Sequence, residues 1–321
     1  MTSTCVITGV AGFIGSHLAA SMLADGWRIV GIDNFDPYYD RASKERNLRE
    51  IAHDQLVVHE LDILDRAPLI ERIRAERPAR IVHIAALAGV RPSIQSPERF
   101  VAVNLDGLTN VLDAAHAASC RSVLFASSSS VYGNSTVVPF REDDPVSAPI
   151  SPYAATKRAG ELLCHTYHHL FDMSIACLRF FTVFGPRQRP DLAIHKFMKL
   201  IAHGESVPMF GDGSTSRDYT YIDDIIAGIR AAGDWANPDT PRFGIFNLGG
   251  STPVTLSDMI DRIARTVGSP AQIDQQPMQP GDVNQTYADL THSSATLGYA
   301  PTMSFDEGLV RQWSWYQSVH A

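Results

Sequence analysis

Short apolar runs alternate with amphipathic stretches through the first half of the chain. The apolar runs, rich in Val, Ile and Leu, are Cys5–Thr8, Arg28–Ile32, Gln55–His59, Arg80–His83, Ser122–Ala126 and Ser174–Leu178. Most lack the alternation of a sheet with one face in water, so they predict buried parallel strands. The amphipathic stretches between them are Phe13–Ala24, Asp65–Glu76, Pro97–Ala118 and Pro152–Phe171. Strands separated by helix-length segments predict an α/β fold with a doubly wound parallel sheet.

The pattern changes after Leu178. Pro and Gly gather at Gly185–Pro190, Gly211–Thr215, Pro238–Pro241 and Pro277–Gly281, which is typical of a smaller, loop-rich lobe. Tyr221–Trp235 and Gly244–Leu248 again have the pattern of a helix and a strand. We therefore expect a main domain over residues 1–181, to which about 220–248 return, and a smaller C-terminal α/β lobe over 182–321.

Composition narrows the function classes. The 321 residues are 45% hydrophobic, enough for a packed core, and they carry 27 Lys and Arg against 35 Asp and Glu. A net charge of −8 argues against nucleic-acid binding, which needs a basic surface. The cysteines, Cys5, Cys120, Cys164 and Cys177, form no C-x-x-C pair, so neither a metal site nor a disulfide framework is indicated. No apolar run approaches the roughly 18 residues of a membrane helix, and we expect a cytoplasmic protein.

A glycine-rich turn follows the first predicted strand. Gly9, Gly12 and Gly15 have the spacing G-x-x-G-x-x-G, and Phe13 and Ile14 open the predicted helix. Such a turn lets backbone N–H groups at a helix N-terminus approach a pyrophosphate.

Acidic residues follow the second and third strands. Asp33 lies 18 residues after Gly15, next to Asn34, where a carboxylate accepts ribose hydroxyls and favours NAD over NADP. The alternative for Asp33 is a turn or capping residue. Asp62 and Ile63 follow the third strand and could flank the adenine, although a plain loop aspartate fits nearly as well.

A candidate proton relay follows the fifth strand. Ser127–Ser130 stand at its predicted end, and Tyr153 and Lys157 share one face of the next helix at positions i and i+4. A neighbouring ammonium, together with a positively charged nicotinamide ring, favours the phenolate, so we expect a lowered Tyr153 pKa. The alternative is an amphipathic surface pair.

Together these motifs resemble the short-chain dehydrogenase/reductase superfamily, in its extended branch of nucleotide-sugar epimerases and dehydratases. The resemblance implies a Rossmann domain that binds NAD, with Ser128, Tyr153 and Lys157 as the catalytic residues; Ser128 precedes Tyr153 by 25 positions. It also implies that Asn104, Lys157, Ala85, Ala86 and Leu87 position the ribose and nicotinamide, and that Phe180 packs near the ring. A homodimer through the helix near 104–118 and the Tyr153 helix is implied as well.

The resemblance implies that the C-terminal lobe binds a UDP-sugar. Phe210 matches a stretch that lines the nucleotide, and Arg217 matches a contact to the diphosphate. The segment Gln279-Pro280-Gly281-Asp282 matches one that contacts the ribose, with Gln279 and Asp282 in the site. Many epimerases carry Arg where this chain has Gln279, so one charged phosphate contact is absent or supplied elsewhere.

The reaction type depends on the residues after Ser128. Related dehydratases and decarboxylases carry acidic residues there, whereas Ser129 and Ser130 are neutral. The stretches Asp33–Asp40, Ala86–Pro92 and Gly185–Asp191 resemble UDP-glucuronate 4-epimerases. Arg189, with the neutral hydroxyls of Thr182, Ser129 and Ser130, would bind the sugar carboxylate. We therefore expect interconversion of UDP-glucuronate and UDP-galacturonate through a 4-keto intermediate. The alternatives are a UDP-glucose/UDP-galactose 4-epimerase, a decarboxylase or an inactive NAD-binding regulator.

Overall fold

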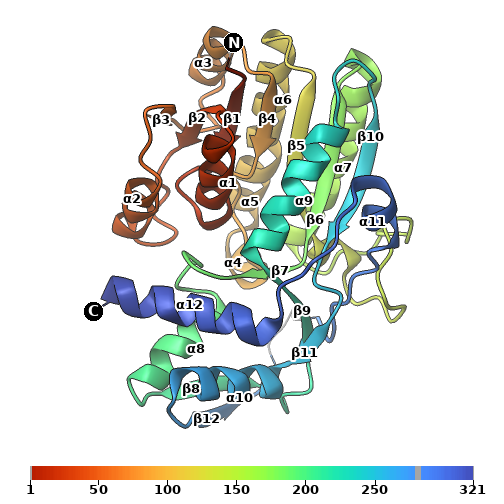
Figure 1. Cartoon of the computed structure of the whole chain (residues 1–321). Helices are drawn as coiled ribbons and strands as arrows, with labels where there is room; N and C mark the ends of the chain where they lie inside the picture. Colours follow the sequence, from red (N-terminus) through yellow and green to blue (C-terminus); the bar gives the residue numbers. More distant parts are fainter. Residues whose placement is uncertain (1, 279–282, 321) are drawn as a thin grey trace.

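The computed structural model describes residues 2–278 and 283–320, and its centre is a seven-stranded parallel sheet (Figure 1). The strand order is β10-β6-β5-β4-β1-β2-β3. The strands are β1 (Thr4–Thr8), β2 (Arg28–Asp33), β3 (Leu56–Glu60), β4 (Arg80–His83), β5 (Ser122–Ser128), β6 (Ser174–Phe180) and β10 (Phe243–Leu248). Every neighbouring pair is parallel, which confirms the predicted α/β fold.

Two apolar layers cover the sheet because successive strand residues point to opposite faces. Cys5 and Ile7 join a layer with α1 (Phe13–Ala24) and α9 (Ile222–Trp235), while Val6 joins the opposite layer. That second layer contains α3 (Arg66–Glu76), α6 (Gly107–Ala117) and α7 (Pro152–Phe171). The strands are therefore buried on both sides, as their apolar runs indicated.

The stretch predicted as one helix over Pro97–Ala118 is interrupted. The structure has α5 (Pro97–Val101), a π-helical turn over Ala102–Asp106, and then α6. Such turns bulge one residue out of the helical ladder and occur often beside functional sites. Here the turn contains Asn104, whose buried side chain bonds across to other elements.

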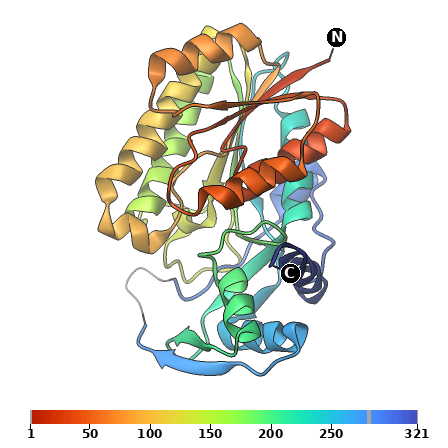
Figure 2. The same ribbon diagram turned by 90° about the vertical axis from the view of Figure 1, so that its left-hand side faces the viewer.

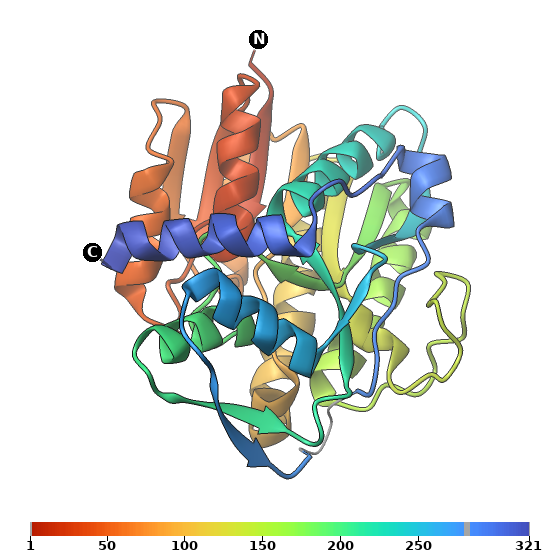
Figure 3. The same cartoon turned by 60° about the horizontal axis from the view of Figure 1, so that its bottom comes forward.

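A second body of structure lies below the carboxyl ends of the central strands (Figure 2). It has a three-stranded sheet of β11 (Pro253–Thr255), β9 (Ser216–Tyr221) and β7 (Thr182–Phe184), and a pair of β12 (Gln272–Gln276) with β8 (Ser206–Phe210). Its helices are α8 (Ala193–Ala202), α10 (Leu256–Val267) and α12 (Phe305–His320). Helix α12 crosses the molecule towards α2 (Arg41–Glu50) (Figure 3), where the Arg46 guanidinium lies 5.6 Å from the Trp315 ring.

The remaining helices are short, α4 (Val90–Gln95) and α11 (Thr291–Leu297). Among the described residues, every helix falls short of the length and apolar character that crossing a bilayer requires. All four cysteines are free and buried.

Candidate active site

The glycine turn forms one wall of a pocket at the carboxyl ends of the sheet strands. Gly9 has φ +74°, a conformation that side chains disfavour. A Cβ on Gly15 would lie 2.1 Å from the Gly9 carbonyl oxygen, so α1 is pressed against the turn. No side chain caps the start of α1 at Gly12, which leaves its first N–H groups for a ligand. These residues therefore fit the pyrophosphate of a dinucleotide.

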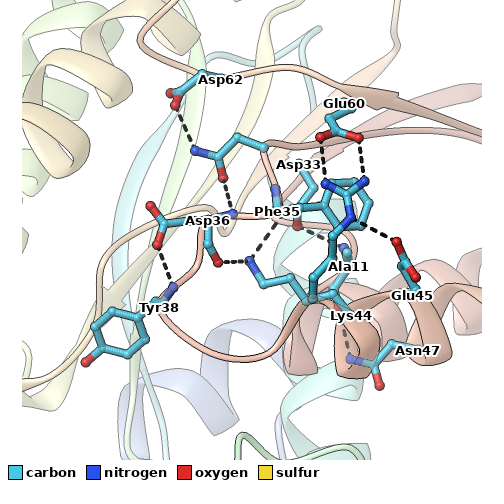
Figure 4. Close-up of polar contacts among 12 residues, drawn as sticks. Ala11, Asp33, Phe35, Asp36, Tyr38, Lys44, Glu45, Asn47, Glu60 and Asp62 are labelled. Carbon is cyan, nitrogen blue, oxygen red and sulfur yellow. Dashed lines mark hydrogen bonds and ion pairs between the residues drawn. The ribbon is translucent and has the colours of Figure 1, made fainter.

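Asp33 stands at the end of β2 and is held by the backbone around it (Figure 4). One carboxylate oxygen accepts from the Ala11 N–H (3.1 Å), and the other accepts from the Phe35 N–H (2.9 Å). The Lys44 ammonium lies 3.8 Å from Asp33 and donates to the Asp36 carbonyl at 3.0 Å. The carboxylate is thus tied to the glycine turn, which is where the ribose of a bound dinucleotide would lie.

The neighbouring predicted residues are arranged around Asp62. The Asn34 amide donates to the Asp62 carboxylate at 2.7 Å (Figure 4), and the Leu64 N–H donates to it at 2.8 Å. Ile63 is buried, and Gly107 gives it room, because a Cβ there would lie 2.5 Å from the Ile63 side chain. Asn34, Asp62 and Ile63 line the same pocket as Asp33.

Tyr153 and Lys157 reach the pocket from the first turns of α7. Ser151 caps this helix by accepting from the Ala154 N–H, and Pro152 occupies its first turn, both favourable there. The buried Lys157 ammonium donates to the Ala126 carbonyl at 2.7 Å. Burial lowers the pKa of Lys157 to about 8.

The protein alone does not lower the pKa of Tyr153; the expected lowering, which also depends on the charged nicotinamide ring, stays a prediction. Burial raises the pKa of Tyr153, and the Ser128 hydroxyl and the positive charge of Arg189 act in the opposite direction. Lys157 is engaged with a β5 carbonyl instead. The positive side chain that acts on the phenol is therefore Arg189, far away in sequence.

Ser128 is the member of the serine cluster that faces the pocket together with Ser127. Its hydroxyl accepts from the Ser130 N–H (3.2 Å) and donates to the Ser130 hydroxyl (3.1 Å). Ser129 is buried, and neither Ser129 nor Ser130 is among the described residues that line the pocket.

Asn104 acts behind the pocket wall. Its amide accepts from the Leu87 N–H (2.9 Å) and donates to the Leu87 carbonyl (3.0 Å) and the Thr156 hydroxyl (3.0 Å). It therefore ties the 85–87 segment to α7, and it does not line the pocket itself. Ala85, Ala86 and Leu87 do line it.

Arg189 enters the pocket from the loop after β7. Its Nε and Nη2 donate to the two Asp191 carboxylate oxygens at 3.0 and 2.8 Å, and Nη2 also donates to the Ala88 carbonyl at 3.2 Å. The guanidinium lies 5.0 Å from the centre of the Tyr38 ring. Thr182 and Phe180 line the same pocket.

The nearby Arg187 serves a different purpose. Its guanidinium is 3.1 Å from Glu50 and donates to the Ser16 hydroxyl at 3.2 Å. Arg187 is largely buried and is not among the described residues that line the pocket. Its contacts hold the loop against α1 and α2.

Phe210 and Arg217, expected at the nucleotide, are not among the described residues that line this pocket. Phe210 ends β8, and the Arg91 guanidinium lies 4.4 Å from its ring. Arg217 lies on β9, where it donates to the Ser216 carbonyl at 2.9 Å. Gln279 and Asp282 lie outside the described residues.

Sequence reasoning missed several residues that line the pocket. They are Asp36, Tyr38, Tyr39 and Lys44, in or just after the segment that follows Asp33. The available signal was the polar and aromatic run Asp33–Asp40, which continues past the strand end. The predicted residues that the pocket does bring together are Gly9, Gly12, Phe13, Ile14, Gly15, Asp33, Asn34, Asp62, Ile63, Ala85, Ala86, Leu87, Ser128, Tyr153, Lys157, Phe180, Thr182 and Arg189.

Comparisons with known proteins agree with this arrangement. Residues 6–312 match the family model described as GDP-mannose 4,6 dehydratase. The chain is 39% identical to a probable UDP-glucuronate 4-epimerase of Rhizobium meliloti, over 97% of this chain and 96% of that protein.

Solved structures are similar over nearly the whole chain. A UDP-glucuronic acid 4-epimerase of Bacillus cereus in complex with UDP-glucuronic acid and NAD has a TM-score of 0.91 and 33% identity, and the match covers 98% of this chain and 99% of that one. A UDP-glucose 4-epimerase of Thermotoga maritima with UDP-glucose has a TM-score of 0.88 and 27% identity, with 99% and 100% covered. The chain therefore belongs to the GDP-mannose 4,6 dehydratase family, in the extended short-chain dehydrogenase/reductase branch, which confirms the resemblance.

Proposed function

We propose that this protein is an NAD-dependent UDP-glucuronate 4-epimerase, which interconverts UDP-glucuronate and UDP-galacturonate. The observation that carries the proposal is that Arg189 and Tyr153 line one pocket, close enough for the arginine's charge to lower the pKa of the phenol. An anion-binding group thus stands beside the proton acceptor, as a sugar with a carboxylate next to its reacting carbon requires.

The pocket also fits the cofactor of such a reaction. Gly9, Gly12 and Gly15 would hold the pyrophosphate, and Asp33 would accept from the adenosine ribose. NAD, when bound, supplies a hydride acceptor that is restored within one turnover. Asn104 holds the 85–87 segment in position through its hydrogen bonds to Leu87, so we expect it to shape the pocket wall without contacting the cofactor.

Proton transfer falls to Tyr153. Its phenolate would take the proton of the sugar C4 hydroxyl when C4 is oxidised to the ketone. The resulting phenol would return that proton to the C4 oxygen when C4 is reduced again from its opposite face. Ser128 contacts both the phenol and the pocket, so its hydroxyl can bridge phenol and substrate oxygen. Lys157 lines the same pocket, and we expect its positive charge to add to that of Arg189 in stabilising the phenolate once cofactor and substrate are bound.

The carboxylate adds a requirement. The 4-keto product is a β-keto acid, which loses carbon dioxide when the breaking C–C bond aligns with the carbonyl π system. Arg189 would hold the carboxylate out of that alignment, with Thr182 as a neutral hydroxyl partner in the same pocket. An acidic residue at position 129 or 130 would repel the substrate, and both positions are serine.

A panel of UDP-sugars tests the proposal directly. Purified protein is incubated with UDP-glucuronate, UDP-glucose and UDP-N-acetylglucosamine, and the products are identified by chromatography. We expect UDP-galacturonate as the main product. Faster turnover of UDP-glucose would favour the second candidate, a 4-epimerase for neutral sugars like the Thermotoga maritima relative. A UDP-pentose as main product would indicate decarboxylation, and inert NAD would indicate a regulator.

We also propose a homodimer formed through α6 and α7. Leu162 and Leu170 on α7 are 55% and 61% exposed, and a second copy that packed against this face would bury them. The C-terminal lobe would then remain free to bind the UDP moiety through Arg217, Phe210 and the 279–282 segment.

A further inference from the structure

Three consecutive residues at the end of β5 face three residues spaced by one turn on α7. Ala126 accepts from Lys157, Ser127 donates to Glu161, and Ser128 contacts Tyr153. The first and third contacts belong to the reaction already described. The contact between Ser127 and Glu161 has no part in the proton transfer described above, yet it lies between the other two.

Glu161 is the centre of a buried ionic network. Its carboxylate accepts from Arg179 Nε and Nη2 at 2.8 and 2.9 Å and from the Ser127 hydroxyl at 2.7 Å. Arg158 adds a fourth donor at 3.0 Å. The side chains of Glu161 and Arg179 are 0% and 1% exposed, so this pair has been removed from water completely.

The network continues from Arg179 towards β10. Arg179 Nη1 donates to the Tyr132 hydroxyl at 2.9 Å, and that hydroxyl donates to the Asn247 amide oxygen at 2.7 Å. Glu161 lies on α7, Ser127 on β5 and Arg179 on β6. Tyr132 lies in the turn after β5 and Asn247 on β10, so the network around this ion pair connects five elements.

Packing alone does not require this arrangement. Burying two charges costs solvation that their attraction repays only with good geometry, and apolar side chains of similar volume often stabilise a fold equally well. Apolar contacts are non-directional, whereas a two-pronged arginine–carboxylate pair fixes both distance and angle. The directional contact here lies one residue before Ser128 and one turn after Lys157.

We propose that Glu161 and Ser127 are positioning residues of the epimerase reaction. The Glu161–Arg179 pair holds the Ser127 hydroxyl, which sets the register of α7 against β5 and so aims Ser128 at Tyr153. The same carboxylate holds the ammonium of Lys157 in its charged form. This proposal rests on the proposed function, because the effect is measured on the turnover of a UDP-sugar.

The electrostatic part stands on the groups around Lys157. Burial lowers the pKa of Lys157, and the negative charge of Glu161 raises it, as does the Cys164 thiol. From β4, the buried His83 faces the ammonium, which together with burial lowers the pKa of that imidazole, so His83 stays neutral. Cys164 and then Glu161, which lies one turn from Lys157 on α7, are thus the groups that oppose the effect of burial on the pKa of Lys157.

The first test removes one hydroxyl. Ser127→Ala leaves both charges of the ion pair in place, and we expect kcat to fall about tenfold while KM and bound NAD change less than twofold. The matched control is Ser174→Ala, which removes an equally buried hydroxyl that donates to the Asn237 carbonyl at the far end of β6. The control should keep kcat within twofold. A Ser127→Ala enzyme with unchanged kcat would overturn the positioning role.

The second test removes the charge pair. The double variant Glu161→Gln/Arg179→Met leaves no uncompensated buried ion, and its folding is checked by its melting temperature and bound NAD. If Glu161 keeps Lys157 charged, the alkaline limb of the kcat–pH profile moves to lower pH in this variant and stays in place in Ser127→Ala. A folded double variant with an unmoved limb would overturn the electrostatic role. A variant that fails to fold would also overturn it, since the network would then be structural only. Wild-type protein inert on every UDP-sugar would instead refute the proposed function itself.

Discussion

Replacing Arg189 with glutamine separates charged from neutral substrates. Glutamine keeps a polar but shorter side chain, and it removes the positive charge beside Tyr153. We expect Arg189→Gln to weaken the use of UDP-glucuronate much more than that of UDP-glucose, because only the former carries a carboxylate for the guanidinium.

The expected loss of binding energy is the difference between two contacts of Arg189, the one to the sugar carboxylate and the one to Asp191 that it replaces. In this structure its fork is already occupied by the carboxylate of Asp191, a side chain that is 42% exposed. Such a partly exposed pair contributes about 0–1 kcal/mol, whereas a hydrogen bond to a charged group in a closed site contributes about 1.5–3 kcal/mol. The difference leaves about 0.5–3 kcal/mol for the sugar carboxylate, which is roughly a 2–150-fold change in kcat/KM.

The assay compares kcat/KM for UDP-glucuronate and UDP-glucose in wild type and variant, with products resolved by chromatography. We also expect more UDP-pentose from UDP-glucuronate, since the keto intermediate would be less well held. Arg187→Gln is the matched control, because that arginine pairs with Glu50 and Ser16 outside the pocket. Equal losses on both substrates in Arg189→Gln, with no rise in decarboxylation, would refute the carboxylate role.

Three further predictions concern the cofactor, the pH dependence and the assembly. Gly15→Ala places a Cβ 2.1 Å from the Gly9 carbonyl oxygen, so the turn must move; we expect loss of bound NAD, measured as nucleotide released on denaturation, and NAD content equal to wild type would contradict it. The pKa of Lys157 is lowered to about 8, and since only the protonated amine stabilises the phenolate, kcat should decline as the pH rises through about 8; a flat profile up to pH 10 would count against this role. Leu162→Glu puts a charge on the exposed face of α7, and sedimentation should show a monomer where the wild type is a dimer, with Leu64→Glu as a control on another surface.

Parts of the site were predictable because they are encoded locally. The glycine spacing, the strand-end Asp33 and the one-turn separation of Tyr153 and Lys157 each follow from a few neighbouring residues. Local rules failed where the chain departs from regular geometry. The π-helical turn at Ala102–Asp106 lies inside a stretch whose periodicity predicted one helix, and it carries Asn104 behind the pocket wall.

The charges that act on the pKa of Tyr153 could not be predicted from its neighbours in sequence. The i, i+4 spacing correctly places Tyr153 and Lys157 on one helix face, yet the Lys157 ammonium bonds to the Ala126 carbonyl of β5. The charge that acts on the phenol comes from Arg189 in the loop after β7. A pKa depends on burial and on the charges that surround the group in space, so the packing of distant segments decides it.

The sequence by itself determined the parallel α/β sheet, the glycine turn after its first strand, and the one-turn spacing of Tyr153 and Lys157, the pair proposed for proton transfer. Those features follow from periodicity and from short motifs whose geometry is set within one or two turns of chain. Only the tertiary structure decided which residues share a pocket with Tyr153, that Arg189 is held by Asp191, and that Glu161 meets both Ser127 and Arg179. These contacts depend on how helices and strands far apart in sequence pack against each other, and the local sequence pattern does not encode that packing.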